Sequence, residues 1–188
     1  MPDPLTTADS VRLAWPSEAA DIARLQRLGW STTLPSEVGQ PLLAGVSAEQ
    51  MTEAWAGVLA RPADARQRVL VAVAGGDATA PGRVVGFATT VPSQDSDAET
   101  GLDGEVDQFW IEPAVQRQGH GSRLLNACAD TLRADGFRRA RWWVLAADDT
   151  LRRFLTASGW AADGAHREIG SDDGSVRLKQ VRLHTDLG

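Results

Sequence analysis

The turn Gln116-Arg117-Gln118-Gly119-His120-Gly121 has the residue types and spacing of an anion-binding site. It stands between a strand-like stretch and an amphipathic helix, so backbone N–H groups are left unpaired where the helix begins. The helix dipole adds partial positive charge at the same point. Glycines 119 and 121 lack the Cβ atoms that would keep an anion away from this backbone. The turn therefore predicts a main-chain cradle for a diphosphate.

A purely structural turn is the alternative, because glycine pairs between a strand and a helix are common in α/β proteins and most bind nothing. Two other phosphate-binding motifs are excluded. The chain has no Gly-Lys-Ser or Gly-Lys-Thr, and a Gly-x-Gly-x-x-Gly pattern would need glycine where Leu124 stands.

The elements around the turn follow from periodicity. Residues 105–111 are β-branched and aromatic and predict a strand, which Glu112-Pro113 closes. Beyond the turn, Leu124, Leu125, Cys128 and Leu132 recur on one helical face, and Gly136 stands where the helix should end. The unit is strand, glycine-bearing turn and helix.

The rest of the chain alternates strands and helices. A capping box at Ser47–Gln50 opens the clearest helix, which Arg61-Pro62 ends. Another helix is predicted from Pro16-Ser17 to Gly29, and a short one from Asp148 or Asp149 to Gly159. The other predictions are strands at 11–15, 69–74, 83–91, 139–145, 160–169 and 176–184, and loops at 30–46 and 92–104. Strand 139–145 should run parallel to 105–111, because a helix connects the two.

Composition limits the function. The chain has 188 residues, 43% of them hydrophobic, a net charge of −6 and a pI near 5.0, which argues against nucleic acid and anionic membrane surfaces. No apolar run has membrane-spanning length and no secretory signal precedes the first strand, so a cytoplasmic protein is expected. We expect a flexible tail at 1–10 and a single domain at 11–188. One cysteine and three scattered histidines predict neither a disulfide nor a metal site.

The pattern Ile111-x-Pro113-x-x-Gln116-x-x-Gly119-x-Gly121 resembles the coenzyme-A-binding signature of the GNAT superfamily of N-acyltransferases. The predicted order of elements is similar to that family's over roughly residues 11 to 184. The resemblance implies an α/β (α+β) fold with a mixed, mostly antiparallel sheet of six to seven strands and about four helices. It also implies a β-bulge in the strand before the turn, and a V-shaped splay between the two central parallel strands.

The same resemblance implies acetyl-CoA as co-substrate, with no metal. The backbone of Phe109, Trp110 and Ile111 would pair with the pantetheine arm. The cradle for the diphosphate would be formed by Gln116, Arg117, Gln118, Gly119, His120, Gly121 and Ser122. A second family pattern, Asn-x-x-Ala-x-x-Leu-Tyr-x-x-x-Gly-Phe, corresponds to residues 148–160. Asp148 stands at its asparagine position and is a further cofactor-binding candidate.

Acetyl transfer to an amine needs a base, because exposing the neutral form of an alkylamine near pH 7 costs about 4 kcal/mol. Several family members keep a carboxylate at the position of Glu105, which lies roughly 20 Å along the strand from Ile111. Glu105 is therefore the candidate catalytic base and Asp107 its substitute. The alternative for Glu105 is a solvated residue beside an acidic loop.

One departure concerns the leaving group. Leu155 fills the place of the tyrosine that often protonates the departing thiolate, and the chain has no tyrosine. A thiol of pKa about 8.5 can still leave as the thiolate. The resemblance implies an N-acetyltransferase in which a primary amine attacks acetyl-CoA directly in a ternary complex. An acyl-CoA-binding sensor of the same fold with little or no catalysis is the alternative, and a nucleotide-binding α/β domain ranks behind both.

We expect a small-molecule or peptide amine as the acceptor, and a homodimer is left open. Acidic residues in 92–104 and 168–174 favour a cationic acceptor, although loop acidity is usually solvation. Cys128 is expected in the core and His120 at the surface. The tryptophans at 30, 55, 142, 143 and 160 are expected to pack in the interior rather than to form an acceptor platform.

Overall fold

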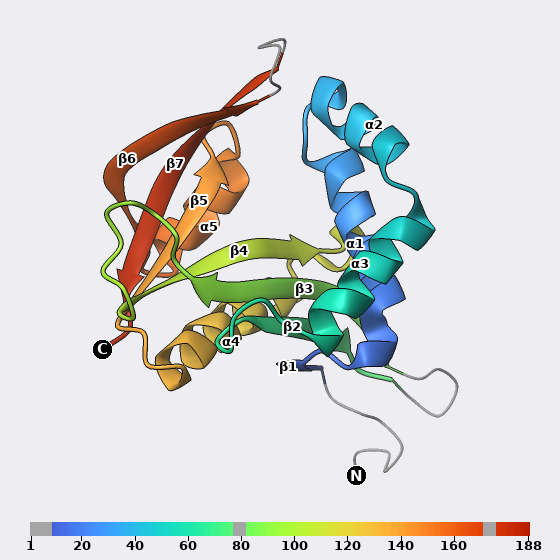
Figure 1. The fold of residues 1–188 in the computed structure, drawn as a ribbon, viewed down its shortest axis with the longest axis horizontal. Coiled ribbons are helices and arrows are strands. Elements are labelled where there is room, and N and C mark those ends of the chain that lie inside the picture. The colour runs from blue at the N-terminus through green and yellow to red at the C-terminus, as the bar shows by residue number, and fades with distance from the viewer. Residues whose placement is uncertain (1–8, 77–81, 171–175) are drawn as a thin grey trace. The chain divides into compact units, whose positions relative to one another are not determined.

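The computed structural model describes residues 9–76, 82–170 and 176–188 (Figure 1). Two 3-10 turns, Pro16–Glu18 and Pro113–Val115, accompany the regular elements. The helices are α1 (Ala19–Thr32), α2 (Ser36–Gly45), α3 (Ala48–Ala60), α4 (His120–Ala134) and α5 (Asp149–Ala157). The strands are β1 (Ser10–Leu13), β2 (Arg68–Ala74), β3 (Arg83–Pro92), β4 (Asp103–Ile111), β5 (Arg139–Leu145), β6 (Ala161–Gly170) and β7 (Arg177–Asp186).

The strands form a seven-stranded sheet in the order β1-β2-β3-β4-β5-β7-β6. β4 and β5 are parallel, as the helical connection between them requires, and β7 is antiparallel to both β5 and β6. The mixed, mostly antiparallel sheet confirms the predicted fold class. None of the helices in the part of the chain described is long and apolar enough to cross a membrane.

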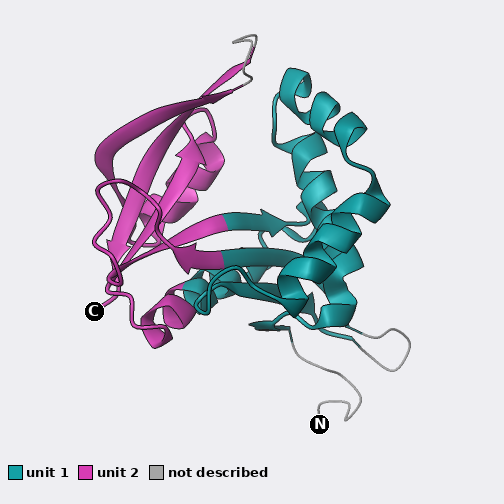
Figure 2. Ribbon diagram, viewed as in Figure 1, with its two compact units in different colours: residues 1–89, 108–128 teal, residues 90–107, 129–188 magenta. Residues whose placement is uncertain are grey.

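The chain divides into two compact units, and β3, β4 and α4 each contribute residues to both (Figure 2). Unit 1 comprises residues 1–89 and 108–128, and unit 2 comprises residues 90–107 and 129–188. The expected single domain at 11–188 remains a prediction.

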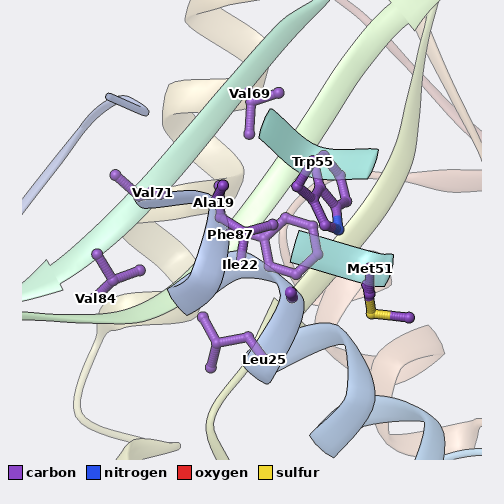
Figure 3. Close-up of a cluster of buried hydrophobic side chains, with 10 residues drawn as sticks. Ala19, Ile22, Leu25, Met51, Trp55, Val69, Val71, Val84 and Phe87 are labelled. Carbon is purple, nitrogen blue, oxygen red and sulfur yellow. The ribbon is translucent and has the colours of Figure 1, made fainter. Parts of the chain in front are cut away.

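Unit 1 is built on a hydrophobic cluster between α1, α3, β2 and β3 (Figure 3). Ile22 and Leu25 enter it from α1, one turn apart, as the helical period requires. Trp55 from α3 meets Phe87 of β3 edge to face, with ring centroids 5.2 Å apart. The expected core position of Trp55 is thus confirmed, and Trp30 packs against the same cluster.

In unit 2 buried residues come from β4, β5, β7, α5 and the second half of α4. Trp142 and Trp160 are buried and meet edge to face at 6.0 Å. Leu155 is fully buried, as are Leu132 and Phe137. These positions explain why the sequence between 139 and 160 is rich in large apolar residues.

α2 corrects the prediction of a loop at 30–46. Pro41 lies inside this helix and removes one of its hydrogen bonds, so the local sequence argues against it. The Arg27 guanidinium on α1 donates to the carbonyls of Leu43 and Val46 at the end of α2. This long-range cap satisfies carbonyls that the helix end leaves open.

The predicted stop of the first helix at Gly29 is also wrong, because α1 continues to Thr32. Gly29 is required by packing. A Cβ atom at this position would lie 2.1 Å from the indole ring of Trp110, so only glycine allows the ring to lie against the helix. The capping box of α3 forms as predicted, with Ser47 as N-cap. Asp148 is the N-cap of α5, also as predicted.

Three predicted features lie wholly or partly outside the described residues: the tail at 1–8, the connection at 77–81 and the turn at 171–174. Ser10, which the sequence places in the tail, begins β1.

Candidate functional site

The turn before α4 has an unusual backbone. Arg117 has φ 63° and Gly119 has φ 88°, so two residues in three adopt the left-handed conformation. For arginine this conformation is strained, and such strain is typical of functional sites. Left-handed residues within a turn direct successive N–H groups toward one side and form a concavity that suits an anion.

The N–H groups of this turn are available to a ligand. In the described chain, the amides of residues 117–122 donate to no backbone or side-chain acceptor. Hydrogen bonding resumes at Arg123, whose amide donates to the Gly119 carbonyl at 3.1 Å. Of these residues, 117–119 and 122 are exposed. An anion placed there would meet unpaired donors and the positive end of the α4 dipole.

One of the predicted cradle residues differs in burial from the prediction. His120 is only 3% exposed, which corrects the expectation of a surface side chain. Its Nε2 atom lies 3.9 Å from an Asp9 carboxylate oxygen, and Arg123 Nη1 lies 3.2 Å from the same oxygen. The Gly75 amide also donates to Asp9, and this hydrogen bond is the main cause of the lowered pKa of that carboxyl. Asp9 thus contacts two side chains in the first turn of α4, those of His120 and Arg123.

β4 carries the bulge that the resemblance implies. At one end the Ser93 amide donates to the Asp103 carbonyl, and at the other the Glu112 amide donates to the Val85 carbonyl. β3 advances eight residues between these bonds, whereas β4 advances nine. One extra residue therefore lies in β4. Between the two ends, the Gln108 amide donates to the Thr89 hydroxyl at 3.0 Å.

β4 and β5 pair over a short distance. Their parallel register joins only Asp103–Glu105 to Arg139–Arg141, although β4 continues to Ile111 and β5 to Leu145. The parallel ladder therefore ends well before either strand does, at the place where the resemblance implies a splay between the two strands. Glu105 is the last residue of β4 within the parallel pairing.

Glu105 is half-buried, and its pKa is raised to about 7. Burial is the main cause, and the negative charges of Asp95 and Asp107 add to it. Arg167 and a 3.4 Å hydrogen bond from the Ser93 hydroxyl act in the opposite direction. A carboxyl group with this pKa exchanges a proton near neutral pH, as a general base must. Asp107, the substitute candidate, is exposed.

The acidic loop before β4 is fixed by buried arginines. Arg182 binds Asp95 at 2.8 Å and Asp97 at 2.7 Å, and Arg141 binds Asp97 and Asp103 at 2.8 Å each. Both guanidinium groups are buried. These carboxylates neutralise internal charges, so the acidity of the loop is no evidence for a cationic acceptor.

Asp95 links this network to Glu105. Its carboxylate also accepts a hydrogen bond from the Trp143 indole at 3.0 Å. Asp95→Asn keeps a hydrogen-bond acceptor for the indole and removes one negative charge near Glu105. We expect the pKa of Glu105 to fall, because less repulsion opposes its ionisation.

NMR titration of the side-chain carboxyl groups measures this change without any need for activity. Trp143→Phe is the matched control, since it removes the indole donor and leaves the charge of Asp95 in place. A Glu105 titration midpoint that is the same in wild type and Asp95→Asn would contradict the assigned role of Asp95.

The other predicted residues have clear structural positions. Asp148 accepts a hydrogen bond from the Leu151 amide at 2.9 Å and so caps α5. Trp110 lies against α1 with its indole N–H bonded to Gln108. Cys128 is fully buried, as predicted, and burial raises the pKa of its thiol to about 12, which makes it unreactive.

A cavity of about 500 Å³ lies elsewhere in unit 2, between α5 and the strands β6 and β7. None of the predicted site residues lines it. Its lining residues are Asp149, Arg152, Arg153, Thr156, Ala157, Ala162 and Leu183. Among the described residues, no group of three or more histidine, cysteine or acidic side chains could hold a metal ion.

A mixed sheet with a bulged strand that leads into an open main-chain turn at a helix start defines a class of α/β proteins suited to anionic ligands. A family model, the acetyltransferase (GNAT) family, matches residues 41–160, which is well over half of the chain. The chain therefore belongs to the GNAT family of acetyltransferases. No curated protein sequence matches it.

Solved structures share the fold at low sequence identity. The N-acetyltransferase from Staphylococcus aureus Mu50 has a TM-score of 0.71 at 13% identity, covering 97% of this chain and 100% of that one. The phosphinothricin acetyltransferase Pat from Sinorhizobium meliloti, in complex with acetyl-CoA, has a TM-score of 0.69 at 17% identity, covering 97% and 90%. The structure of yncA from Salmonella typhimurium, determined with acetyl-CoA, has a TM-score of 0.68 at 16% identity, covering 97% of this chain and 95% of that one.

Proposed function

We propose that the protein is an acetyl-CoA-dependent N-acetyltransferase, in which a primary amine attacks the thioester directly in a ternary complex. The observation that carries this proposal is the row of unpaired amides at 117–122 at the start of α4, in a chain of this family. Two structures similar to this chain were determined with acetyl-CoA bound. The amides would hold the diphosphate of acetyl-CoA, and the backbone of residues 109–111 would pair with the pantetheine arm.

Glu105 supplies the proton acceptor in this mechanism. The amine nitrogen attacks the thioester carbonyl carbon, so that a C–N bond forms and the C–S bond breaks. The proton from the amine passes to the Glu105 carboxylate, directly or through water, and the sulfur leaves as the thiolate. The raised pKa of Glu105 suits this task, because the group is partly ionised at neutral pH and holds the proton well once it has accepted it.

The leaving thiolate has no tyrosine to protonate it. Leu155 occupies that place and is fully buried, and the chain contains no tyrosine. The thiolate of CoA, with a pKa of about 8.5, leaves without an acid at moderate cost. The same observation favours the second candidate function, an acyl-CoA sensor of the same fold with little or no catalysis.

Two measurements test the proposal. Thermal denaturation should show stabilisation by acetyl-CoA and not by ATP or NAD, which a nucleotide-binding domain would prefer. A thiol-release assay with a panel of small and peptide amines should then show free CoA formed only when an accepted amine is present. Stabilisation by acetyl-CoA without thiol release from any amine would favour the sensor.

A further inference from the structure

Gln108 on β4 ends a chain of hydrogen bonds within unit 1. The Trp55 indole N–H donates to Gln26 Oε1 at 2.7 Å, and Gln26 Nε2 donates to Gln108 Oε1 at 3.3 Å. The Trp110 indole N–H donates to the same Gln108 oxygen at 3.1 Å. We call these four residues the glutamine chain.

The chemistry of indole fixes the orientation of both amides. An indole N–H can only donate, so the atom that it contacts must be the carbonyl oxygen of the amide. This holds for Gln26 through Trp55 and for Gln108 through Trp110. Gln108 therefore directs its oxygen into the glutamine chain and its NH₂ group to the other side.

Burial holds this orientation in place. Trp55 and Gln26 are 7% and 8% exposed, and the Trp110 ring lies against Gly29 of α1. Turning the Gln108 amide over would leave two donors without an acceptor, at a cost of about 1–3 kcal/mol each.

The Gln108 NH₂ group has no protein partner. Within residues 9–76, 82–170 and 176–188, no group accepts a hydrogen bond from Gln108 Nε2. Gln108 is half-buried, and its Nε2 is not among the fully buried side-chain atoms that lack a partner, so this atom keeps some exposure to solvent. A preoriented amide donor on a fixed side chain is suited to bind an oxygen of a ligand.

We infer that Gln108 binds a carbonyl or carboxylate oxygen of the amine acceptor, and that the protein selects amines which carry such an oxygen. This inference rests on the proposed function. Along β4, Gln108 comes three residues after Glu105, the proposed base, and directly before residues 109–111, whose backbone would pair with the pantetheine arm. The carboxylates of Asp95, Asp97 and Asp103 bind internal arginines and are therefore not available to a cationic acceptor.

The thioester of acetyl-CoA is the other source of a carbonyl oxygen, and the experiment separates the two. The probes are amino acids, their amides and the corresponding amines without the carboxyl group, for example methionine, methioninamide and 3-(methylthio)propylamine. We expect wild type to acetylate accepted amino acids at least about 10-fold more efficiently, by kcat/KM, than the bare amines, which is typical for a hydrogen bond to a charged group. The neutral amides should be preferred over the bare amines by about 2- to 10-fold.

Gln108→Glu is the decisive variant. It keeps an oxygen for the Trp110 and Gln26 donors, so folding should be preserved, and it replaces the outward NH₂ group with a second oxygen. We expect kcat/KM for the carboxylate-bearing amines to fall about 100-fold, because the new oxygen repels them. Bare amines should change by no more than a few-fold, and the ratio of acetyl-CoA to CoA affinity in calorimetry should stay the same. Gln108→Leu should abolish the preference without reversing it.

Each other outcome is informative. If amino acids, their amides and the bare amines were all acetylated with similar kcat/KM, this inference would be overturned and the proposed function would stand. A Gln108→Glu variant with at least 10-fold weaker binding of acetyl-CoA and unchanged binding of CoA would place the bound oxygen on the thioester and also overturn it. No turnover of any amine would overturn the proposed function and, with it, this inference.

Discussion

Replacing Gly119 with aspartate is expected to weaken acetyl-CoA binding at least 100-fold. The new carboxylate would stand within the turn whose amides are unpaired, beside the place proposed for the diphosphate. Two like charges about 4 Å apart near a protein surface repel by about 4 kcal/mol, which exceeds the roughly 3 kcal/mol of a 100-fold change. Isothermal titration calorimetry with acetyl-CoA measures this effect.

Gly119→Asn is the matched control. Gly119 has φ 88°, a conformation that asparagine and aspartate tolerate better than other side chains, so the two variants share the same backbone strain. The atoms nearest to a Cβ at this position belong to the flexible guanidinium of Arg123, the closest at 3.4 Å. The asparagine variant should lose only a few-fold in affinity. Equal affinities of the two variants for acetyl-CoA would show that the turn does not hold the charged end of the ligand.

Glu105→Gln is expected to lower kcat/KM for an accepted amine by about 100- to 10,000-fold at pH 7.5, the range typical for loss of a general base. Acetyl-CoA affinity should change little, because the diphosphate cradle is left intact. In wild type, activity should rise with pH through about 7, since the carboxylate is the active form. The variant should lack this rise. Glu99→Gln, which removes an exposed charge from the loop before β4, is the control and should retain activity.

The pKa of Glu105 has a consequence for stability that needs no substrate. Because folding raises this pKa from 4.5 to about 7, the neutral form contributes to stability fully below pH 4.5, and this contribution is lost as pH rises through 7. Glu105→Gln mimics the neutral form. Its free energy of unfolding relative to wild type should therefore increase by about 2 to 3 kcal/mol between pH 5 and pH 8. A pH-independent difference, or a greater loss of activity in Asp107→Asn, would remove Glu105 as the base.

The strand, turn and helix around the cradle are predictable because their signals are local. Apolar residues at helical spacing, the glycines of the turn and the capping box at Ser47 all act within a few residues of their position. The bulge and the parting of β4 from β5 came from the resemblance, since neither leaves a periodic signal in the sequence.

The features that the sequence did not reveal depend on distant partners. α2 contains Pro41 and is capped by an arginine of α1, and Gly29 is explained by a tryptophan that lies 81 positions further along the chain. The acidic loop could be interpreted as solvated because nothing local indicates that Arg141 and Arg182 bind it. The glutamine chain joins residues 26, 55, 108 and 110 through tertiary contacts alone.

The most direct test of the central claim is to follow the backbone amides of residues 117–122 by ¹⁵N NMR while CoA is added. In the free protein these amides donate to no protein group, so hydrogen bonds to the diphosphate should shift their resonances more than those of the sheet and protect them from exchange with solvent. Gly119→Asp should lose the shifts at the same CoA concentration. Saturation with CoA that leaves the resonances of residues 117–122 unmoved would contradict the account.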